Sequence, residues 1–278
     1  MRTRVAVGLA FIVSCAAFLT SCQETTSEVP AASFAQLPNA AEVAVAAARE
    51  DGYTGGVGAV VIDATGTYTA GDLTTTNAWS TIKVPIVLAA LKEDPDLEDS
   101  DLVEATLRWS DNDTSWTLWK QLGSTAAERE AKVEAVLRAA GDTQTTVDVT
   151  TGEQYGITQW SLRNQATLAS NLRCLDNSGP VLDYMGDVIE EQHWGVGTID
   201  GALFKGGWSP DDEGAYQARQ MALIPVKSGG DVTVVLATNV ESEEYREDAE
   251  DALTRAAESL KPYLKTAQGR DCALNFNP

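Results

Sequence analysis

The order of strand-like and helix-like segments is the feature that most restricts how this chain can fold. An Ala-rich helix after Pro38 leads into two strand-like segments, Gly55–Asp63 and Gly66–Gly71. Residues from about 80 to 188 are almost entirely helix-like. Three more strand-like segments then precede a long amphipathic helix: 202–208, 217–224 and 231–238. Because sequential strands joined by short turns pair antiparallel, these segments predict one antiparallel sheet.

The predicted fold class is therefore α+β. It has a five-stranded antiparallel sheet flanked by terminal helices, and an all-helical lobe inserted between the second and third strands. We expect a signal peptide at 1–21 and a flexible tether at 22–37, followed by the folded domain at 38–278. Within that domain the sheet lobe takes about 38–79 and 200–278, and the helical lobe about 80–199.

A candidate reactive serine lies where the strands give way to the helical lobe. Ser80 and Lys83 are three residues apart at the start of an apolar helix. Residues at this spacing share one face of a helix, so the lysine amine can take the proton of the serine hydroxyl. The first helical turn also offers unpaired backbone N–H groups to a developing anion. The alternative is that Ser80 only caps its helix, because serine is a favoured N-cap residue.

Two further motifs follow in the sequence. Ser110-Asp111-Asn112 lies in a loop between two helices, and Lys205-Gly206-Gly207-Trp208 lies in the third strand-like segment. Each has a structural alternative: the first equally describes a capped helix start, and the second a glycine-softened edge strand. Together with Ser80-x-x-Lys83, and in this order, they resemble the motif set of class A β-lactamases and penicillin-binding proteins. The resemblance spans about residues 38 to 266.

The resemblance implies an acyl-serine mechanism. The catalytic residues that it implies are Ser80, Lys83, Ser110, Asn112 and Lys205. Lys83 would act as the base, held neutral by partial burial and by the charge of Lys205 nearby. Ser110 would pass a proton between Lys205 and the leaving group, while Asn112 would hold Lys83 and a substrate amide.

The resemblance also implies where a substrate would bind. The backbone N–H groups of Ser80 and Trp208 would form an oxyanion hole, in which the loss of one donor costs roughly 3–4 kcal/mol in the barrier. Gly206 and Gly207 would line the binding strand. The family has Thr or Ser where this chain has Gly206, and that hydroxyl binds the substrate carboxylate, a contact worth about 1.5–3 kcal/mol. Arg219, on the neighbouring strand, is the candidate to replace it.

A second departure concerns deacylation. Class A β-lactamases carry Glu-x-x-Leu-Asn in the loop after the helical lobe, where the Glu activates water. The non-helical segment Gly141–Ile157 has only Asp148 and Glu153 as interior acids, and neither precedes Leu-Asn. We therefore expect a serine hydrolase acting on a small amide or ester related to cell-wall peptides, with weak or no β-lactam turnover. The alternative is a non-catalytic lipoprotein that binds a wall component or a protein partner.

The amino terminus resembles a lipoprotein signal. Arg2 and Arg4 precede the apolar run Val5–Leu19, which is too short for a membrane span, and Leu19-Thr20-Ser21 then meets Cys22. This ending resembles the bacterial lipobox and implies cleavage before Cys22 and lipid on its sulfur, which would anchor the protein to a membrane. The alternative is a plain signal peptide that contains a cysteine. Either case predicts an extracytoplasmic location.

Of the four cysteines, Cys15 lies in the expected signal peptide and Cys22 would carry lipid. Cys174 and Cys272 remain and predict a disulfide, because pairs outside the cytoplasm are usually oxidised. The formal net charge of −21 argues against a nucleic-acid partner, since phosphate contact needs a basic surface. No Cys, His and carboxylate cluster has metal-ligand spacing, so we expect no metal or cofactor, and we expect a monomer. We expect Trp79 and Trp208 to pack in the core or at the rim of the site rather than to determine specificity. We expect His193 to be a surface residue rather than a catalytic base.

Overall fold

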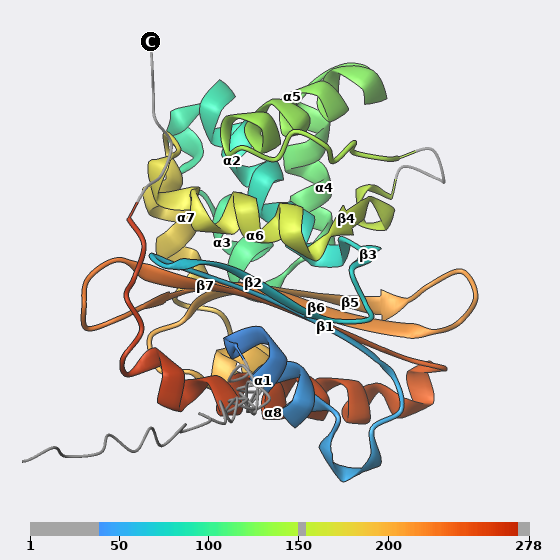
Figure 1. The fold of residues 1–278 in the computed structure, drawn as a ribbon. Coiled ribbons are helices and arrows are strands. Elements are labelled where there is room, and N and C mark those ends of the chain that lie inside the picture. Colours follow the sequence, from blue (N-terminus) through green and yellow to red (C-terminus); the bar gives the residue numbers. More distant parts are fainter. Residues whose placement is uncertain (1–38, 150–153, 272–278) are drawn as a thin grey trace, which may run out of the picture. The chain divides into compact units, whose positions relative to one another are not determined.

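A five-stranded antiparallel sheet lies at the centre of the fold (Figure 1). The computed structural model describes residues 39–149 and 154–271, which belong to one compact unit. The strand order is β2-β1-β7-β6-β5, so strands from the two ends of the domain meet where β1 pairs with β7. The strands are β1 (Gly56–Asp63), β2 (Gly66–Gly71), β5 (Leu203–Pro210), β6 (Tyr216–Pro225) and β7 (Asp231–Val240). The predicted α+β fold with one antiparallel sheet is confirmed.

Both terminal helices cover the same face of this sheet. Helices α1 (Ala40–Ala48) and α8 (Arg246–Leu264) lie side by side beneath it in Figure 1. Alanines at helical spacing, including Ala41, Ala44 and Ala48, are fully buried, because their small side chains let α1 approach α8 and the sheet closely. Asn39 and Glu42 close a capping box at the start of α1.

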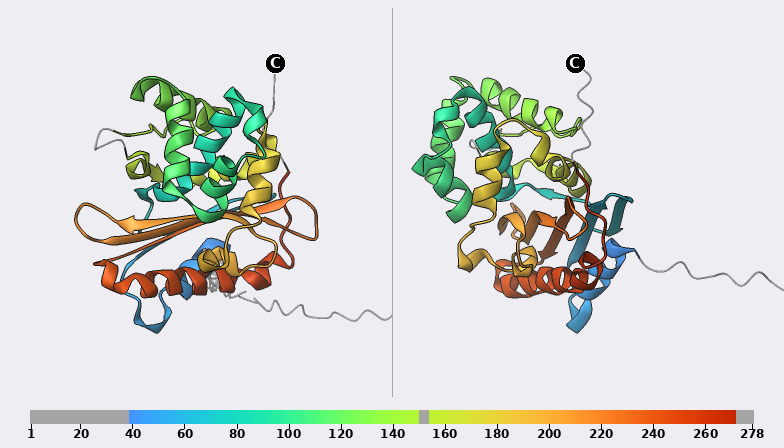
Figure 2. Two further views of the ribbon diagram at one scale, coloured as in Figure 1. Left: turned by 180° about the vertical axis from the view of Figure 1, so that it is seen from behind. Right: turned by 90° about the vertical axis from the view of Figure 1, so that its left-hand side faces the viewer.

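The opposite face of the sheet carries the helical lobe (Figures 1 and 2). Its central helix, α2 (Lys83–Glu93), is buried along every residue from Lys83 to Leu91, as expected of a helix that is apolar on all sides. The helices around it are α3 (Asp101–Glu104), α4 (Asn112–Gln121), α5 (Ala126–Ala139), α6 (Leu162–Ser170) and α7 (Ser178–Met185). In residues 39–149 and 154–271 we find no helix with both the length and the apolar character needed to cross a membrane.

Short helical turns join these elements. They are η1 (Glu50–Gly52), η2 (Trp79–Ile82), η3 (Pro95–Leu97), the π-helical turn η4 (Ala105–Trp109), η5 (Tyr155–Ile157), η6 (Leu172–Cys174), η7 (Glu190–Gln192), η8 (Gly195–Thr198) and η9 (Glu243–Tyr245). The Ser161 hydroxyl accepts a hydrogen bond from the backbone N–H of Asn164, at 3.1 Å, so α6 begins only at Leu162.

A small second sheet was not predicted from the sequence. Strand β3 (Thr75–Asn77) pairs with β4 (Gln159–Ser161), each three residues long. Strands this short leave little periodicity in the sequence, and their pairing depends on a partner more than 80 residues away. This sheet connects the segment before Ser80 with the segment before α6.

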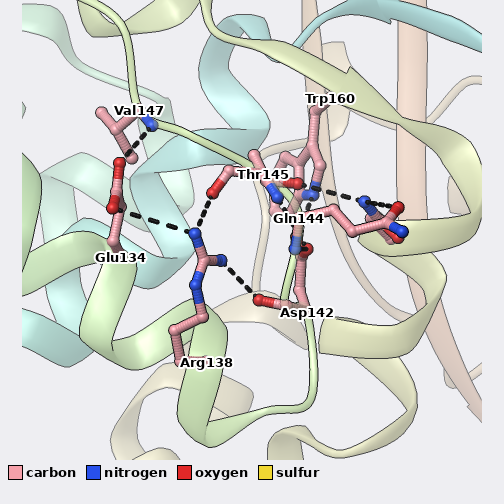
Figure 3. A network of polar contacts seen from close by, with 8 residues as sticks. Glu134, Arg138, Asp142, Gln144, Thr145, Val147 and Trp160 are labelled. Atoms are coloured by element: carbon pink, nitrogen blue, oxygen red, sulfur yellow. Dashed lines mark hydrogen bonds and ion pairs between the residues drawn. The ribbon is translucent and has the colours of Figure 1, made fainter.

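The first part of the long non-helical segment is held firmly (Figure 3). Arg138 donates hydrogen bonds to the backbone oxygens of Asp142 and Thr145, at 2.5 and 2.6 Å. The Asp142 carboxylate in turn accepts the indole N–H of Trp160 at 2.9 Å, and Glu134 accepts the backbone N–H of Val147 at 2.9 Å. Residues 142–147 are therefore fixed against α5 and β4.

Candidate active site

Ser80 lies on η2, one turn before α2. No side chain caps either η2 or α2, so the alternative that Ser80 serves as a helix cap is not what the structure shows. Trp79 has a φ of 47°, an uncommon left-handed conformation for a residue with a side chain. The Ser80 side chain lines a pocket that also contains Lys83 and Asn112.

Strand β5 approaches η2 closely because Gly207 lacks a side chain. A Cβ atom at this position would lie 2.7 Å from the backbone nitrogen of Ser80 and 2.9 Å from that of Thr81. No real Cβ atom tolerates such distances, so the contact requires glycine. The N–H groups at the start of η2 thus lie against β5, where the expected oxyanion hole would form with Trp208.

The three motifs meet at two lysine side chains. The Nζ atom of Lys83 donates to the backbone oxygen of Ser110 at 2.5 Å and to Oδ1 of Asn112 at 2.7 Å, and lies 3.4 Å from the Ser110 hydroxyl. The Nζ atom of Lys205 donates to the same hydroxyl at 2.8 Å and to the oxygen of Gly206 at 3.1 Å. The Ser110 hydroxyl therefore bridges the two amines.

Local structure places Ser110 and Asn112 for these contacts. Helix α3 ends in the π-helical turn η4, and Ser110 then takes a left-handed φ of 58°. The Asp111 side chain accepts the backbone N–H of Thr114 at 2.8 Å and caps α4, so Asn112 is the first residue of that helix. The helix-cap alternative for this motif is correct for Asp111, and it coexists with the lysine contacts of the two residues beside it.

Burial changes the acidity of both amines. Burial lowers the pKa of Lys83 to about 8 from an ordinary value of 10.5, while the nearby Asp111 carboxylate raises it. Lys205 is fully buried, and burial followed by the charge of Lys83 holds its pKa well below the usual range. Two ammonium groups that share one hydroxyl repel each other, which favours the neutral form of either amine. A neutral amine is thus accessible near Ser80 at neutral pH.

The pocket at this site has a volume of about 390 Å³. Besides the motif residues, its wall includes Asp113, Trp116 and Tyr155. The Tyr155 hydroxyl lies 2.7 Å from the hydroxyl of Ser115, and its ring stacks on Trp116 with a centroid distance of 6.0 Å. None of these three was predicted as a site residue, although Asp113 directly follows Asn112 in the sequence. A larger cavity of about 620 Å³ beside Tyr53 and Arg255 contains none of the predicted site residues.

Arg219 does not take its predicted place. It is fully buried, and its guanidinium donates to the backbone oxygens of Thr76, Asn77 and Trp160 at 3.0–3.1 Å. It also donates to the side-chain oxygen of Gln165 at 2.7 Å. The prediction that Arg219 binds a substrate carboxylate is wrong, because these contacts occupy it beneath the β3–β4 sheet, away from the pocket.

The two glycines of the third motif face opposite ways. A Cβ atom on Gly206 would lie 3.4 Å from the Trp208 ring and 3.7 Å from Trp194 and Gln220, whereas Gly207 faces η2. Trp208 and Trp79 both line the pocket. The ring of Trp208 also meets the ring of Trp194 edge-on, with a centroid distance of 5.6 Å. Gly206 thus lies against this aromatic pair.

Other predicted positions lie apart from the pocket. Asp148 does not line it, and Glu153 falls outside the described residues. His193 is exposed, and its Nε2 atom lies 2.9 Å from the backbone oxygen of Val188. Within residues 39–149 and 154–271 no group of His, Cys, Asp and Glu side chains could hold a metal ion.

The predicted lipidation and disulfide positions are mostly outside the described residues. Cys22 and Cys272 both belong to undescribed segments, and Cys174 ends η6. Lipid on Cys22 and the pairing of Cys174 with Cys272 therefore stay predictions.

Comparisons with solved structures agree on one fold. A class A β-lactamase from Mycobacterium abscessus has a TM-score of 0.59 at 18% identity, over 78% of this chain and 97% of that protein. A class A β-lactamase representative from Bacteroides cellulosilyticus has a TM-score of 0.62 at 13% identity, over 81% and 99%. The TLA-3 extended-spectrum β-lactamase has a TM-score of 0.62 at 15% identity, over 79% and 96%. No family model and no curated protein matches the sequence.

Proposed function

We propose that this chain, which has the fold of the class A serine β-lactamases, is an extracytoplasmic serine hydrolase that acts through an acyl-serine intermediate. The observation that carries the proposal is the Ser110 hydroxyl, which lies 2.8 Å from the amine of Lys205 and 3.4 Å from that of Lys83. Purely structural lysines are rarely buried without carboxylate partners. This arrangement is costly for the fold and suits proton transfer.

In the proposed reaction the Ser80 hydroxyl attacks the carbonyl carbon of an amide or ester. Its proton passes to the neutral amine of Lys83 while the carbonyl oxygen becomes an anion. The backbone N–H groups of Ser80 and Trp208 would stabilise that anion. Collapse of the adduct breaks the bond to the leaving group, which takes a proton from the Ser110 hydroxyl. Ser110 recovers its proton from the lysine pair, and water later releases the acid.

The pocket offers little to catalyse the hydrolysis of the acyl-enzyme by water. Among the described residues that line the pocket, Asp113 is the one carboxylate, and it is exposed at the start of α4. A weak base for water would make the acyl-enzyme long-lived. We therefore propose weak or no β-lactam turnover and a small amide or ester substrate from the cell envelope. Any β-lactam that acylates Ser80 should add its full mass to the Ser80 peptide and stay there.

A serine-directed fluorophosphonate tests the proposal directly. Wild-type protein should be labelled on the Ser80 peptide, Ser80→Ala should not be labelled, and Lys83→Met should label at least about a hundredfold more slowly while remaining folded. Ser209→Ala, which removes another hydroxyl from the pocket wall, is the matched control and should label normally. Rapid repeated turnover of nitrocefin would contradict the proposed slow release.

The competing function is that of a non-catalytic binding protein. The missing hydroxyl at Gly206 and the buried position of Arg219 favour it, because neither residue offers a polar group to a substrate carboxylate. A folded protein that reacts with no fluorophosphonate and no β-lactam would support it.

We further propose that lipid on Cys22 holds the domain at a membrane. Cys22→Ala should then lose lipid labelling and leave the membrane fraction, and continued membrane association would argue against the anchor.

A further inference from the structure

The pocket has little positive charge to offer a ligand. Lys83 is the one cation among the described residues that line it, it is 1% exposed, and its amine donates to Ser110 and Asn112. Lys205 is fully buried behind it and donates to Ser110 and Gly206. Both amines therefore donate to groups of the protein itself, and both lie near the Ser110 hydroxyl.

The other cations near the site are also engaged. Arg246 stacks on the Trp208 ring at 6.0 Å, and its Nε atom is paired with the carboxylate of Glu250 at 2.7 Å. Lys120 lies 6.0 Å from the centre of the Trp116 ring and does not line the pocket. An incoming carboxylate would therefore meet no open cation on the described wall, and its desolvation would go uncompensated.

Asp113 gives the pocket the opposite charge. It is exposed, it lines the pocket next to Asn112, and it has no ion-pair partner among the described residues. It lies in the first turn of α4. The chain as a whole carries a formal charge of −21, which adds a long-range field of the same sign.

Aromatic residues line the same pocket as Asp113. Trp116 lies three residues after Asp113, one turn along α4, and stacks with Tyr155 across the pocket wall. Trp79 and Trp208 line the pocket as well. A pocket lined by one carboxylate and several aromatic rings can attract organic cations, through charge and through cation–π contact.

We propose that the pocket selects substrates that carry a cationic amine or no charge, and rejects carboxylates, with Asp113 as the residue that determines this preference. The inference rests on the proposed function in that it treats the entering molecule as a substrate of Ser80. It applies to esters and amides whose acyl or leaving group ends in an ammonium group.

Equilibrium binding tests the preference without requiring any reaction. The probes are benzyltrimethylammonium and phenylacetate, followed by tryptophan fluorescence at low salt, because three tryptophans line the pocket. Wild-type protein should bind the cation at least about tenfold more tightly than the anion. Asp113→Asn should reduce this ratio about tenfold, and Asp113→Lys should reverse the preference. Asp176→Asn, an exposed acid outside the pocket, has the same change of charge and should leave the ratio within about twofold.

A second measurement separates the inference from the proposed function. The p-nitrophenyl esters of 4-(trimethylammonio)butyrate and of succinate differ in charge, and each releases one nitrophenolate per acylated Ser80. A burst that favours the cationic ester supports both proposals. A burst with equal rates, or a binding ratio that Asp113→Asn leaves unchanged, overturns the charge preference alone. If the binding ratio depends on Asp113 but neither ester gives a burst, the charge preference stands and the proposed hydrolase function is overturned.

Discussion

The pH dependence of Ser80 acylation is the sharpest consequence of the buried lysine pair. With a pKa of about 8, about a tenth of Lys83 is neutral at pH 7, against about one in three thousand for a lysine with the ordinary pKa of 10.5. Because the base acts only when neutral, the acylation rate should rise about tenfold from pH 6 to pH 7 and level off above about pH 9. A lowered pKa shifts this plateau to lower pH.

Asp111→Asn changes the same quantity in a known direction. The Asp111 carboxylate raises the pKa of Lys83, so its removal should lower that pKa and move the inflection to lower pH. The rate at pH 7 can then rise by at most about tenfold, because about a tenth of the amine is already neutral. Asparagine is as good an N-cap as aspartate, so the start of α4 should be retained. The hydrogen bond from the backbone of Thr114 lowers the pKa of Asp111 itself, so its charge persists over the assay range.

The assay is the stopped-flow burst of a p-nitrophenyl ester between pH 5.5 and 10.5, with the thermal unfolding of each variant measured in parallel. Asp176→Asn serves as the control for a general change of charge and should leave the inflection in place. An inflection near pH 10 in the wild type would show that burial does not lower the pKa of Lys83. An upward shift in Asp111→Asn would refute the electrostatic reasoning.

Three predictions concern stability and covalent structure. Gly207→Ala should destabilise the protein by about 1–3 kcal/mol in chemical denaturation and abolish acylation, because the new methyl would lie 2.7 Å from the backbone nitrogen of Ser80. Gly206→Ala is the control: its methyl would meet the Trp208 ring at 3.4 Å, an ordinary contact distance, so its stability should remain close to that of the wild type. Arg219→Ala should cost about 3–5 kcal/mol in unfolding free energy, since it leaves several buried oxygens unpaired; normal stability with altered substrate binding would contradict this. Cys174 and Cys272 should resist maleimide in the native protein, and reduction should cost up to about 4–5 kcal/mol; two free thiols would refute the pairing.

The described neighbours of the two cysteines support the last of these predictions. Arg173, next to Cys174, forms an ion pair with Asp231, and the backbone of Asp231 pairs with that of Arg270. The chain segments that lead to each cysteine thus meet at one residue of β7.

Sequence alone was sufficient for the features that depend on neighbours in the chain. The β1–β2 hairpin, the apolar helix α2 and the succession of strands along the chain follow from alternation, helical periodicity and turn residues, all of which act over a few positions. The three motifs also stood out in the sequence, and four of their polar side chains meet as expected: Lys83, Ser110, Asn112 and Lys205. Their resemblance to a known motif set supplied the spatial arrangement that spacing could not.

Only the tertiary structure decided how those residues are surrounded. Arg219 lies in a strand-like segment, and nothing in the local sequence indicates that it will be buried against the small β3–β4 sheet, which was not predicted. The pKa of Lys83 is lowered by burial, which depends on helices packed from elsewhere in the chain. Asp113 lines the pocket next to the cap residues of α4, and nothing in the local sequence indicates that this helix start faces a pocket. Burial and the distances between remote side chains depend on the whole fold, so a pattern of a few residues cannot predict them.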